Sequence, residues 1–387
     1  MIRATLVAAA LLFAAPAHAD FAACVRSLRA DAADKGVSDK TLAAAFDGLQ
    51  PDAKVLELEG AQPEFKTPIW DYMAGLVDDE RVADGKAAMA REAGALAKAE
   101  ARFGVDRHVL AAIWGVESNF GENTGGRPLV QSLATLACQS DVRPAYYRGE
   151  LMAALKIADR GDIPLDKLNG SWAGAFGQTQ FMPSSFLRLA VDLDGSGRDI
   201  VDNPAAALGS TANYLAKSGW RTGLPWGFEV KLPDGYSGPS GRKAKAPMAT
   251  WASRGIKRID GKPLGDGDAG LLLPAGPQGP AFLVTRNFDV IYSYNAAESY
   301  TLAIAILAQR LAGGPGIVTP WPTDDPGLSR AERRELQALL AKRGYDVGAP
   351  DGAIGNKTKQ AIADFQGKNG MTVDGRASVK VLEALRK

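Results

Sequence analysis

Apolar residues recur three and four positions apart from about residue 20 to about residue 218, and this periodicity constrains the fold more than any other feature. The pattern is typical of helices that bury one face. It is clearest in the Ala-rich stretches 86–102 and 149–160, which consist of good helix formers. The sequence therefore predicts a mainly α-helical domain, and the hydrophobic content of 46% is sufficient for a large core.

The character of the chain changes at Gly219. Gly, Pro and Asp residues there separate short strand-like segments, namely 226–232, 269–274 and 281–294. A helical pattern resumes at Asn295 and continues to about Leu311. We therefore expect a small β-rich insertion, 219–294, inside one helical domain that spans residues 20–311.

A Pro/Gly-rich segment, residues 312–326, follows that domain. Its four prolines and three glycines are typical of an extended, semi-stiff linker. Residues 327–387 then contain an internal repeat, in which L-L-x-x-x-G-Y-x-V (339–347) is echoed by F-Q-x-x-x-G-M-x-V (365–373) and Asp-Gly follows each copy. Each copy predicts a helix closed by a C-cap glycine and a turn. We expect a separate small helical module.

Charge and rare residues narrow the function. The whole chain carries +1, which argues against a nucleic-acid-binding protein. The 327–387 module has 12 basic and 7 acidic residues, and its net charge of +5 fits either adhesion to an anionic polymer or an ordinary solvated surface. His108 is the only histidine beyond residue 18, and no H-E-x-x-H motif is present, so a zinc hydrolase of that type is excluded.

Residues 1–19 have the features of a secretory signal peptide. Arg3 precedes a short apolar run, and Ala17-His18-Ala19 matches an A-x-A cleavage site. No segment reaches the roughly 18 consecutive apolar residues that a membrane span needs. We expect an exported, periplasmic protein that is soluble after cleavage near Ala19.

The only two cysteines are Cys24 and Cys138. In an oxidising compartment such a pair predicts a disulfide. The alternative is that Phe21-Ala22-Ala23-Cys24 is a lipidation box that anchors the protein to a membrane. Asp20 and Pro16 interrupt the apolar run that such a box needs, so the disulfide is favoured.

The segment 104–121, G-V-D-R-H-V-L-A-A-I-W-G-V-E-S-N-F-G, is the most informative. Asp106 is a good N-cap, and S-N-F-G ends the predicted helix. Glu117 shares an apolar stripe with Leu110, Ile113 and Trp114. Burial and the helix dipole both disfavour a carboxylate there and favour the protonated acid, which can protonate a glycosidic oxygen. The plainer interpretation is an ordinary surface Glu.

Three motifs resemble those of the B-type lytic murein transglycosylases: W-G-V-E-S-N-F-G (114–121), G-S-W-A-G-A-F-G-Q-T-Q-F-M-P-S-S-F (170–186) and Y-S-Y-N-A-A-E-S-Y (292–300). Their order and spacing match over roughly residues 21–311, and the set is highly specific. The tail, 327–387, resembles the three-helix peptidoglycan-binding module of cell-wall enzymes. The resemblance implies a lysozyme-like helical fold with a deep groove for a sugar chain.

It also implies that Glu117 is the only catalytic acid/base. Glu117 would protonate the oxygen between N-acetylmuramic acid and N-acetylglucosamine, and then take the proton of the muramic C6 hydroxyl, which closes a 1,6-anhydro ring. This internal hydroxyl replaces the second carboxylate of most glycosidases, so no cofactor is required. The loop acids Glu122 and Asp141 remain alternatives for a second carboxylate.

Other residues match the family's substrate-binding positions: Ser171, Gln180, Phe181, Met182, Tyr214, Tyr294, Asn295 and Tyr300, with Arg143 and Tyr146 farther from the cut bond. Gly174 and Gly177 would either let the backbone approach the ligand or serve as loop glycines. Asn295 would also cap a helix, with Glu298 completing a capping box.

Residues 192–198, D-L-D-G-S-G-R, resemble the start of a calcium loop. Asp192, Asp194 and Ser196 place oxygen ligands on alternate residues. The twelfth position, where an EF-hand has an acid, is Asn203, and a late acidic ligand of some family members is Ala206 here. A weak calcium site and a plain Asx/Gly turn both fit this pattern.

The resemblance thus implies a lyase whose partner is the peptidoglycan glycan strand, with other cell-wall enzymes as candidate partners. Two alternatives stay open. One is a muramidase that hydrolyses the same bond, and the other is a non-catalytic protein that binds the wall through residues 327–387.

Overall fold

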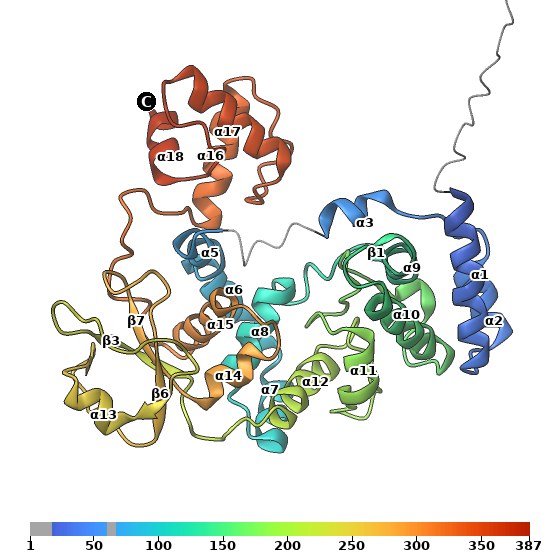
Figure 1. Ribbon diagram of the computed structural model, residues 1–387, viewed down its shortest axis with the longest axis horizontal. Helices are drawn as coiled ribbons and strands as arrows, with labels where there is room; N and C mark the ends of the chain where they lie inside the picture. The colour runs from blue at the N-terminus through green and yellow to red at the C-terminus, as the bar shows by residue number, and fades with distance from the viewer. Residues whose placement is uncertain (1–17, 60–66) are drawn as a thin grey trace, which may run out of the picture. The chain divides into compact units, whose positions relative to one another are not determined.

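The computed structural model describes residues 18–59 and 67–387 (Figure 1). The expected signal peptide lies outside the described residues except for its last two positions. The chain divides into an N-terminal unit, made of the described part of Met1–Gly60 with Gly126–Ala175 and Met182–Ser184, and a main unit with the rest. Across the described ranges, no helix combines the length and apolar character needed to cross a membrane.

The N-terminal unit is helical and is joined by a disulfide. Cys24 in α1 pairs with Cys138 in α9, and their Cα atoms are 5.8 Å apart, which confirms the predicted pairing. A short antiparallel pair, β1 (Arg127–Pro128) with β2 (Asn169–Gly170), closes the 128–170 segment. The helices are α1 (His18–Asp34), α2 (Asp39–Phe46), α3 (Ala53–Leu58), α9 (Leu129–Gln139), α10 (Pro144–Asp159) and the 3₁₀ turn η1 (Leu165–Lys167).

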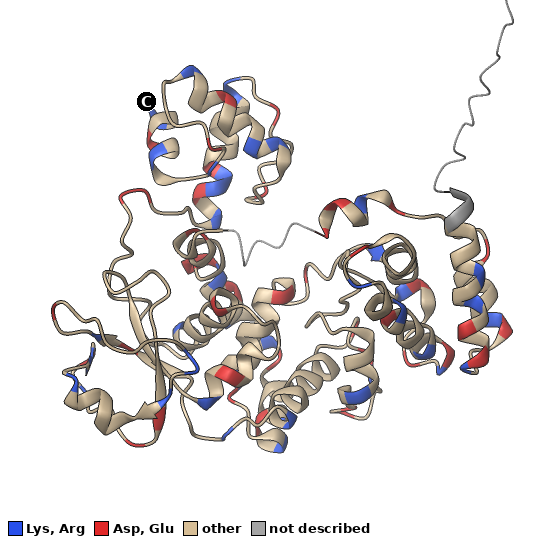
Figure 2. Ribbon diagram, viewed as in Figure 1, with Lys and Arg blue, Asp and Glu red and all other residues tan. Residues whose placement is uncertain are grey.

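The main unit is built around α15 (Glu298–Leu311). Its charged residues lie only at its ends, so the helix is tan along most of its length in Figure 2, and nearly all of it is buried. Both α5 and α8 pack against it, while α12 packs on α7. The other helices are α5 (Ile69–Leu76), α6 (Asp79–Arg91), α7 (Ala93–Phe103), α8 (Arg107–Ser118), α11 (Pro183–Leu189, which begins in the N-terminal unit), α12 (Pro204–Lys217) and α14 (Arg286–Tyr292).

The expected β-rich insertion is an antiparallel five-stranded sheet in the order β4-β6-β7-β3-β5. One of the strand predictions was wrong for the second half of its segment. Residues 281–294 form a strand only as far as Val284, because Thr285 accepts a hydrogen bond from the Asn287 amide and caps α14. The elements are β3 (Gly227–Lys231), β4 (Ala246–Pro247), α13 (Met248–Ser253), β5 (Lys257–Arg258), β6 (Asp268–Leu272) and β7 (Ala281–Val284).

The C-terminal module contains three helices around its own core, as expected: α16 (Arg330–Lys342), α17 (Asn356–Lys368) and α18 (Val379–Arg386). Ser329 and Glu332 form a capping box at the start of α16. The repeat is visible in the geometry, because Gly344 and Gly370 have positive φ directly after the C-caps of α16 and α17. Residues 312–326 contain neither helix nor strand.

Candidate active site

Glu117 is carried by α8, whose bounds match the sequence prediction. Asp106 accepts a hydrogen bond from the His108 amide at 2.7 Å and starts the helix. Leu110, Ile113 and Trp114 are buried on the predicted stripe, and Glu117, one turn beyond Trp114, is half-buried. The helix therefore holds a carboxyl group at the edge of the core rather than in open solvent.

The end of α8 is fixed by an unusual turn. Asn119 and Phe120 both have left-handed backbone conformations, with φ of 51° and 60°, which is uncommon for bulky residues. The Phe120 ring lies over Gly115, where a Cβ would be 2.5 Å from Phe120 Cζ, and meets Trp114 edge to face with centroids 5.7 Å apart. This packing explains why residue 115 is a glycine, because a Cβ there would collide with the Phe120 ring.

Gln178 ties the same turn to the 176–181 loop, and the sequence analysis missed it. The Trp114 indole donates to Gln178 Oε1 at 3.0 Å, and the Ser118 hydroxyl donates to the Gln178 carbonyl at 2.5 Å. Gln178 is buried, so these bonds are shielded from water. Gln178 and Gln180 both lie in the G-Q-T-Q segment (177–180), and the sequence gave no signal that distinguishes one from the other.

Glu117 lines a pocket of about 380 Å³ together with Asp71, Tyr72, Asn295, Tyr300 and Arg333. The Tyr300 hydroxyl donates to Glu117 Oε1. Burial, and then the charge of Glu117, raise the pKa of Tyr300 well above its usual value, so this phenol keeps its proton and remains a donor. The pocket thus presents one carboxyl group whose orientation is set by a buried tyrosine.

Behind this pair lies a cluster of three rings. Tyr214 and Tyr294 have centroids 4.9 Å apart, and Phe181 is about 6 Å from both, at 6.1 and 6.0 Å. The Tyr294 hydroxyl donates to the Thr179 carbonyl at 2.6 Å, and the Tyr214 hydroxyl donates to the Ser293 carbonyl at 2.5 Å. Burial, followed by the charge of Glu117, raises the pKa of Tyr294 well above its usual value. Phe181 is almost fully buried, so here it supports the site from behind.

Gln180 also belongs to the main unit. It has a positive φ of 50°, and its Nε2 donates to the Thr124 carbonyl at 2.9 Å and to the Gly177 carbonyl at 2.8 Å. The structure therefore assembles seven of the predicted residues in the main unit: Glu117, Gln180, Phe181, Tyr214, Tyr294, Asn295 and Tyr300.

Asn295 is not a helix N-cap, so the predicted capping box with Glu298 was wrong. The α15 helix begins at Glu298 with Ala297 as its N-cap, and no side chain caps it. The Asn295 carbonyl instead accepts a hydrogen bond from the Ala297 amide at 2.7 Å in a tight turn. That turn precedes the helix and brings Asn295 to the pocket of Glu117.

The other predicted contacts lie in the N-terminal unit. The Ser171 hydroxyl accepts from the Ala175 amide at 3.1 Å, and Met182 is half-buried before Pro183 opens α11. Arg143 stacks on the exposed ring of Tyr146, with 5.2 Å from guanidinium carbon to ring centroid.

The two motif glycines are explained by packing within the protein. Gly174 and Gly177 have φ of 90° and 74°. A Cβ on Gly174 would meet Leu133 at 2.5 Å, and one on Gly177 would meet Ile200 at 2.7 Å. These contacts favour the structural interpretation over close approach to a ligand.

Neither candidate for a second carboxylate lines the pocket of Glu117. Glu122 accepts a hydrogen bond from Asn119 Nδ2 at 2.5 Å and is exposed, and Asp141 is exposed in the N-terminal unit. The pocket does contain one further acid that the sequence did not suggest, Asp71. Both of its carboxylate oxygens accept hydrogen bonds from Arg376 of the C-terminal module, at 2.6 and 2.7 Å.

In the 192–198 loop the candidate metal ligands form local turns. Asp192 Oδ1 accepts from the Gly195 amide at 2.7 Å, and Asp194 Oδ1 accepts from the Ser196 amide and hydroxyl at 3.1 and 2.6 Å. Asn203, at the twelfth position, caps α12 through its Oδ1. In the described part of the chain, no cluster of three His, Cys, Asp or Glu side chains is placed to hold a metal ion. The hydrogen bonds of Asp192 and Asp194 are those of Asx turns closed by glycines.

Known protein families match two separate parts of the chain. A family described as "Transglycosylase SLT domain" matches residues 20–309, and one described as "Putative peptidoglycan binding domain" matches residues 329–385. Membrane-bound lytic murein transglycosylase B of Escherichia coli (strain K12) is 32% identical over 255 residues, which are 62% of this chain and 66% of that protein. The match thus spans just under two thirds of that relative.

Two solved structures extend the comparison. SltB3 from Pseudomonas aeruginosa, in complex with NAG-anhNAM-pentapeptide, is 44% identical, with a TM-score of 0.76 over 95% of this chain and 100% of that one. The Escherichia coli lytic transglycosylase Slt35 in complex with calcium is 29% identical, with a TM-score of 0.67 over 75% of this chain and 92% of that one.

Proposed function

Because the chain belongs to the transglycosylase SLT domain family, we propose that it is a lytic transglycosylase that cleaves peptidoglycan between N-acetylmuramic acid and N-acetylglucosamine, with Glu117 as acid and then base. The observation that carries the proposal is the position of Glu117, half-buried on the wall of a pocket and oriented by the Tyr300 hydroxyl. This is the arrangement that proton transfer to a bound sugar chain needs.

The reaction balances without water. Protonated Glu117 gives its proton to the glycosidic oxygen as the bond from that oxygen to C1 of the muramic residue breaks. The carboxylate of Glu117 then accepts the proton of the muramic C6 hydroxyl, whose oxygen bonds to C1 and closes the 1,6-anhydro ring. Because the attacking hydroxyl belongs to the same sugar, its effective concentration is high, on the order of 10⁵ M or more in well-oriented cases.

The state of Asp71 supports a lyase over a muramidase. A hydrolase commonly uses a second carboxylate as nucleophile or to activate water. Asp71 lines the pocket of Glu117, but both of its oxygens are held by Arg376. A carboxylate held through both oxygens faces the guanidinium rather than the substrate.

Product analysis tests the proposal. Wild-type protein and Glu117→Gln should be incubated with peptidoglycan sacculi, and the released muropeptides weighed by mass spectrometry. We expect 1,6-anhydro products from the wild type and a loss of turnover of about 10²- to 10⁴-fold in the variant, since Gln cannot transfer the proton. Reducing-end products, one water heavier, would instead identify a muramidase, and full activity of Glu117→Gln would favour a non-catalytic binding protein.

We further propose that the protein is exported to the periplasm and binds the wall through residues 329–385, the part that matches the peptidoglycan-binding family. The Cys24–Cys138 disulfide supports an oxidising compartment. Recovery of the mature chain in a periplasmic extract, with an N-terminus near residue 20, would test the export; recovery with the membranes would contradict it.

We also propose that catalysis needs no metal. The Asp194 and Asn203 oxygens serve turns and a helix cap, which supports a structural loop at 192–198. Calcium titration by calorimetry should therefore give only heat of dilution, and a saturable binding heat would contradict the proposal.

A further inference from the structure

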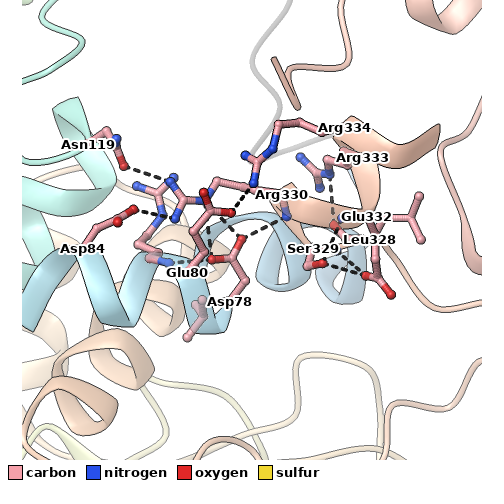
Figure 3. Close-up of polar contacts among 12 residues, drawn as sticks. Asp78, Glu80, Asp84, Asn119, Leu328, Ser329, Arg330, Glu332, Arg333 and Arg334 are labelled. Atoms are coloured by element: carbon pink, nitrogen blue, oxygen red, sulfur yellow. Dashed lines mark hydrogen bonds and ion pairs between the residues drawn. The ribbon is translucent and has the colours of Figure 1, made fainter. Parts of the chain in front are cut away.

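The C-terminal module docks onto the catalytic part of the main unit through arginines. Arg330, the first residue of α16, donates its backbone amide to Asp78 at 3.0 Å and pairs with Asp84 at 2.9 Å (Figure 3). Arg330 also donates to Oδ1 of Asn119, at 3.1 Å. Asn119 is the residue that ends the Glu117 helix. Nearby, Arg334 pairs with Glu80 at 2.6 Å. The first turn of α16 is therefore fixed against α6 and the end of α8.

This docking places Arg333 in the pocket of Glu117. The guanidinium lies directly on α5, where a Cβ on Gly75 would be 2.4 Å from Arg333 Nη2. Arg333 Nε donates to the Leu328 carbonyl at 3.0 Å, and Nη2 donates to the Asp71 carbonyl at 3.1 Å. These two hydrogen bonds, together with the absence of a side chain at Gly75, thus set the orientation of the Arg333 guanidinium.

In the described part of the chain, no acidic side chain forms a direct ion pair with Arg333. Within residues 18–59 and 67–387, its hydrogen-bond partners are backbone carbonyls, and Asp71, whose charge affects Arg333 most, is engaged by Arg376. Burial lowers the pKa of Arg333, because this cation has lost much of its hydration. An incoming anion would offset that loss, and a planar guanidinium suits a carboxylate best.

We propose that Arg333 is a specificity-determining residue through which the C-terminal module binds a carboxylate on the peptide stem of the glycan strand. The proposal rests on the function proposed above, since it places the stem beside the sugar that Glu117 cleaves. Its chemical basis is that stem peptides carry free carboxylates, whereas the sugar ring itself offers hydroxyl and amide groups. The module then acts within the active site as well as on the wall.

A cycle of two substrates and two proteins tests this. The substrates are soluble glycan oligomers with stem carboxylates either free or converted to amides, and kcat/KM is measured from released 1,6-anhydro product. We expect full-length wild type to prefer the free carboxylates by about 10-fold or more, a typical effect of one charge-assisted hydrogen bond. Arg333→Gln should lose that preference and match wild type on the amidated substrate, while Arg333→Lys should keep part of it.

Two further variants separate specificity from folding. Gly75→Ala keeps the charge but displaces the guanidinium, so it should also reduce the preference even if Arg333→Gln is unstable. Arg386→Gln removes an exposed arginine of the same module, which is paired with Glu335. This substitution should leave kcat/KM unchanged on both substrates.

Equal losses on both substrates, or a preference unchanged in Arg333→Gln and Gly75→Ala, would overturn the proposal. That result would leave the proposed function intact as long as wild type forms anhydro products and Glu117→Gln does not. Absence of anhydro products from wild type would instead refute the proposed function itself.

Discussion

At the scale of single residues, the site depends on the hydrogen bond between the Tyr300 hydroxyl and the Glu117 carboxyl group. Tyr300 is almost fully buried in α15, and its raised pKa keeps the phenol protonated at neutral pH. Its hydroxyl can donate to the Glu117 carboxylate, and it can still accept from the protonated acid. The tyrosine therefore orients Glu117 in both of its proposed states.

Removing this hydroxyl should slow the reaction and move its pH optimum. In Tyr300→Phe the carboxylate loses a donor, so the charged form is less stable and the optimum of kcat/KM should shift to higher pH. A hydrogen bond to a charged group contributes about 1.5–3 kcal/mol, so the rate at the optimum should fall by about 10- to 100-fold. The pH–rate profile of the variant measures both effects.

Tyr292→Phe is the matched control. Tyr292 lies in α14, and its ring centroid is 3.7 Å from the Arg242 guanidinium carbon, a stacking contact that Phe retains. Its pH profile should equal that of wild type. An unshifted optimum in Tyr300→Phe would mean that this hydroxyl does not control the protonation of Glu117.

At the scale of elements, local patterns were predictable and long-range contacts were not. The α8 bounds followed from the Asp106 cap and the apolar stripe, both of which are local. The 285–294 segment was wrongly predicted as a strand because Val, Ile and Tyr favour strands. In the structure the Thr285 cap starts a helix there instead. Arg333 gave no signal because its partner Asp71 is 262 residues away in sequence.

The docking of α16 on α6 should depend on pH through Asp78. Burial opposes ionisation of this carboxyl, but backbone hydrogen bonds from Arg81 and Arg330 and the charge of Arg330 outweigh it and lower the pKa of Asp78. The stabilisation is therefore complete above the ordinary Asp pKa of 3.8 and is lost as pH falls through the lowered value. Asp78 also caps α6, so it supports two elements at once.

Asp78→Asn should lower the free energy of unfolding at pH 7 by about 1–3 kcal/mol, since a helix cap and a buried ion pair are weakened together. Denaturant titrations should show the difference from wild type shrinking below about pH 4. The control is Asp346→Asn, which breaks an exposed pair with Lys357 and should cost at most about 1 kcal/mol. Equal effects of the two substitutions would show that Asp78 does not anchor the module.

At the scale of the whole molecule, the active-site elements and the C-terminal module share the main unit, while the disulfide belongs to the N-terminal unit. Four of the module's arginines, Arg330, Arg333, Arg334 and Arg376, face the catalytic part of the same chain. Part of the module's positive charge is thus used for docking, which neither a purely adhesive nor a purely solvated surface would require.

The thermal stability of the N-terminal unit should depend strongly on its disulfide. Cys24 and Cys138 are 114 residues apart, and closing so long a loop restricts the unfolded chain, which typically stabilises a protein by about 2–5 kcal/mol. A reductant should therefore lower the midpoint temperature of the transition in which the N-terminal unit of the wild type unfolds. The double variant Cys24→Ser/Cys138→Ser should unfold at that lower temperature with or without reductant, while the module, which contains no cysteine, should be unaffected. If reduction left every transition in place, the pair would be dispensable for folding, and the disulfide would no longer support the argument that the chain must reach an oxidising compartment to fold stably.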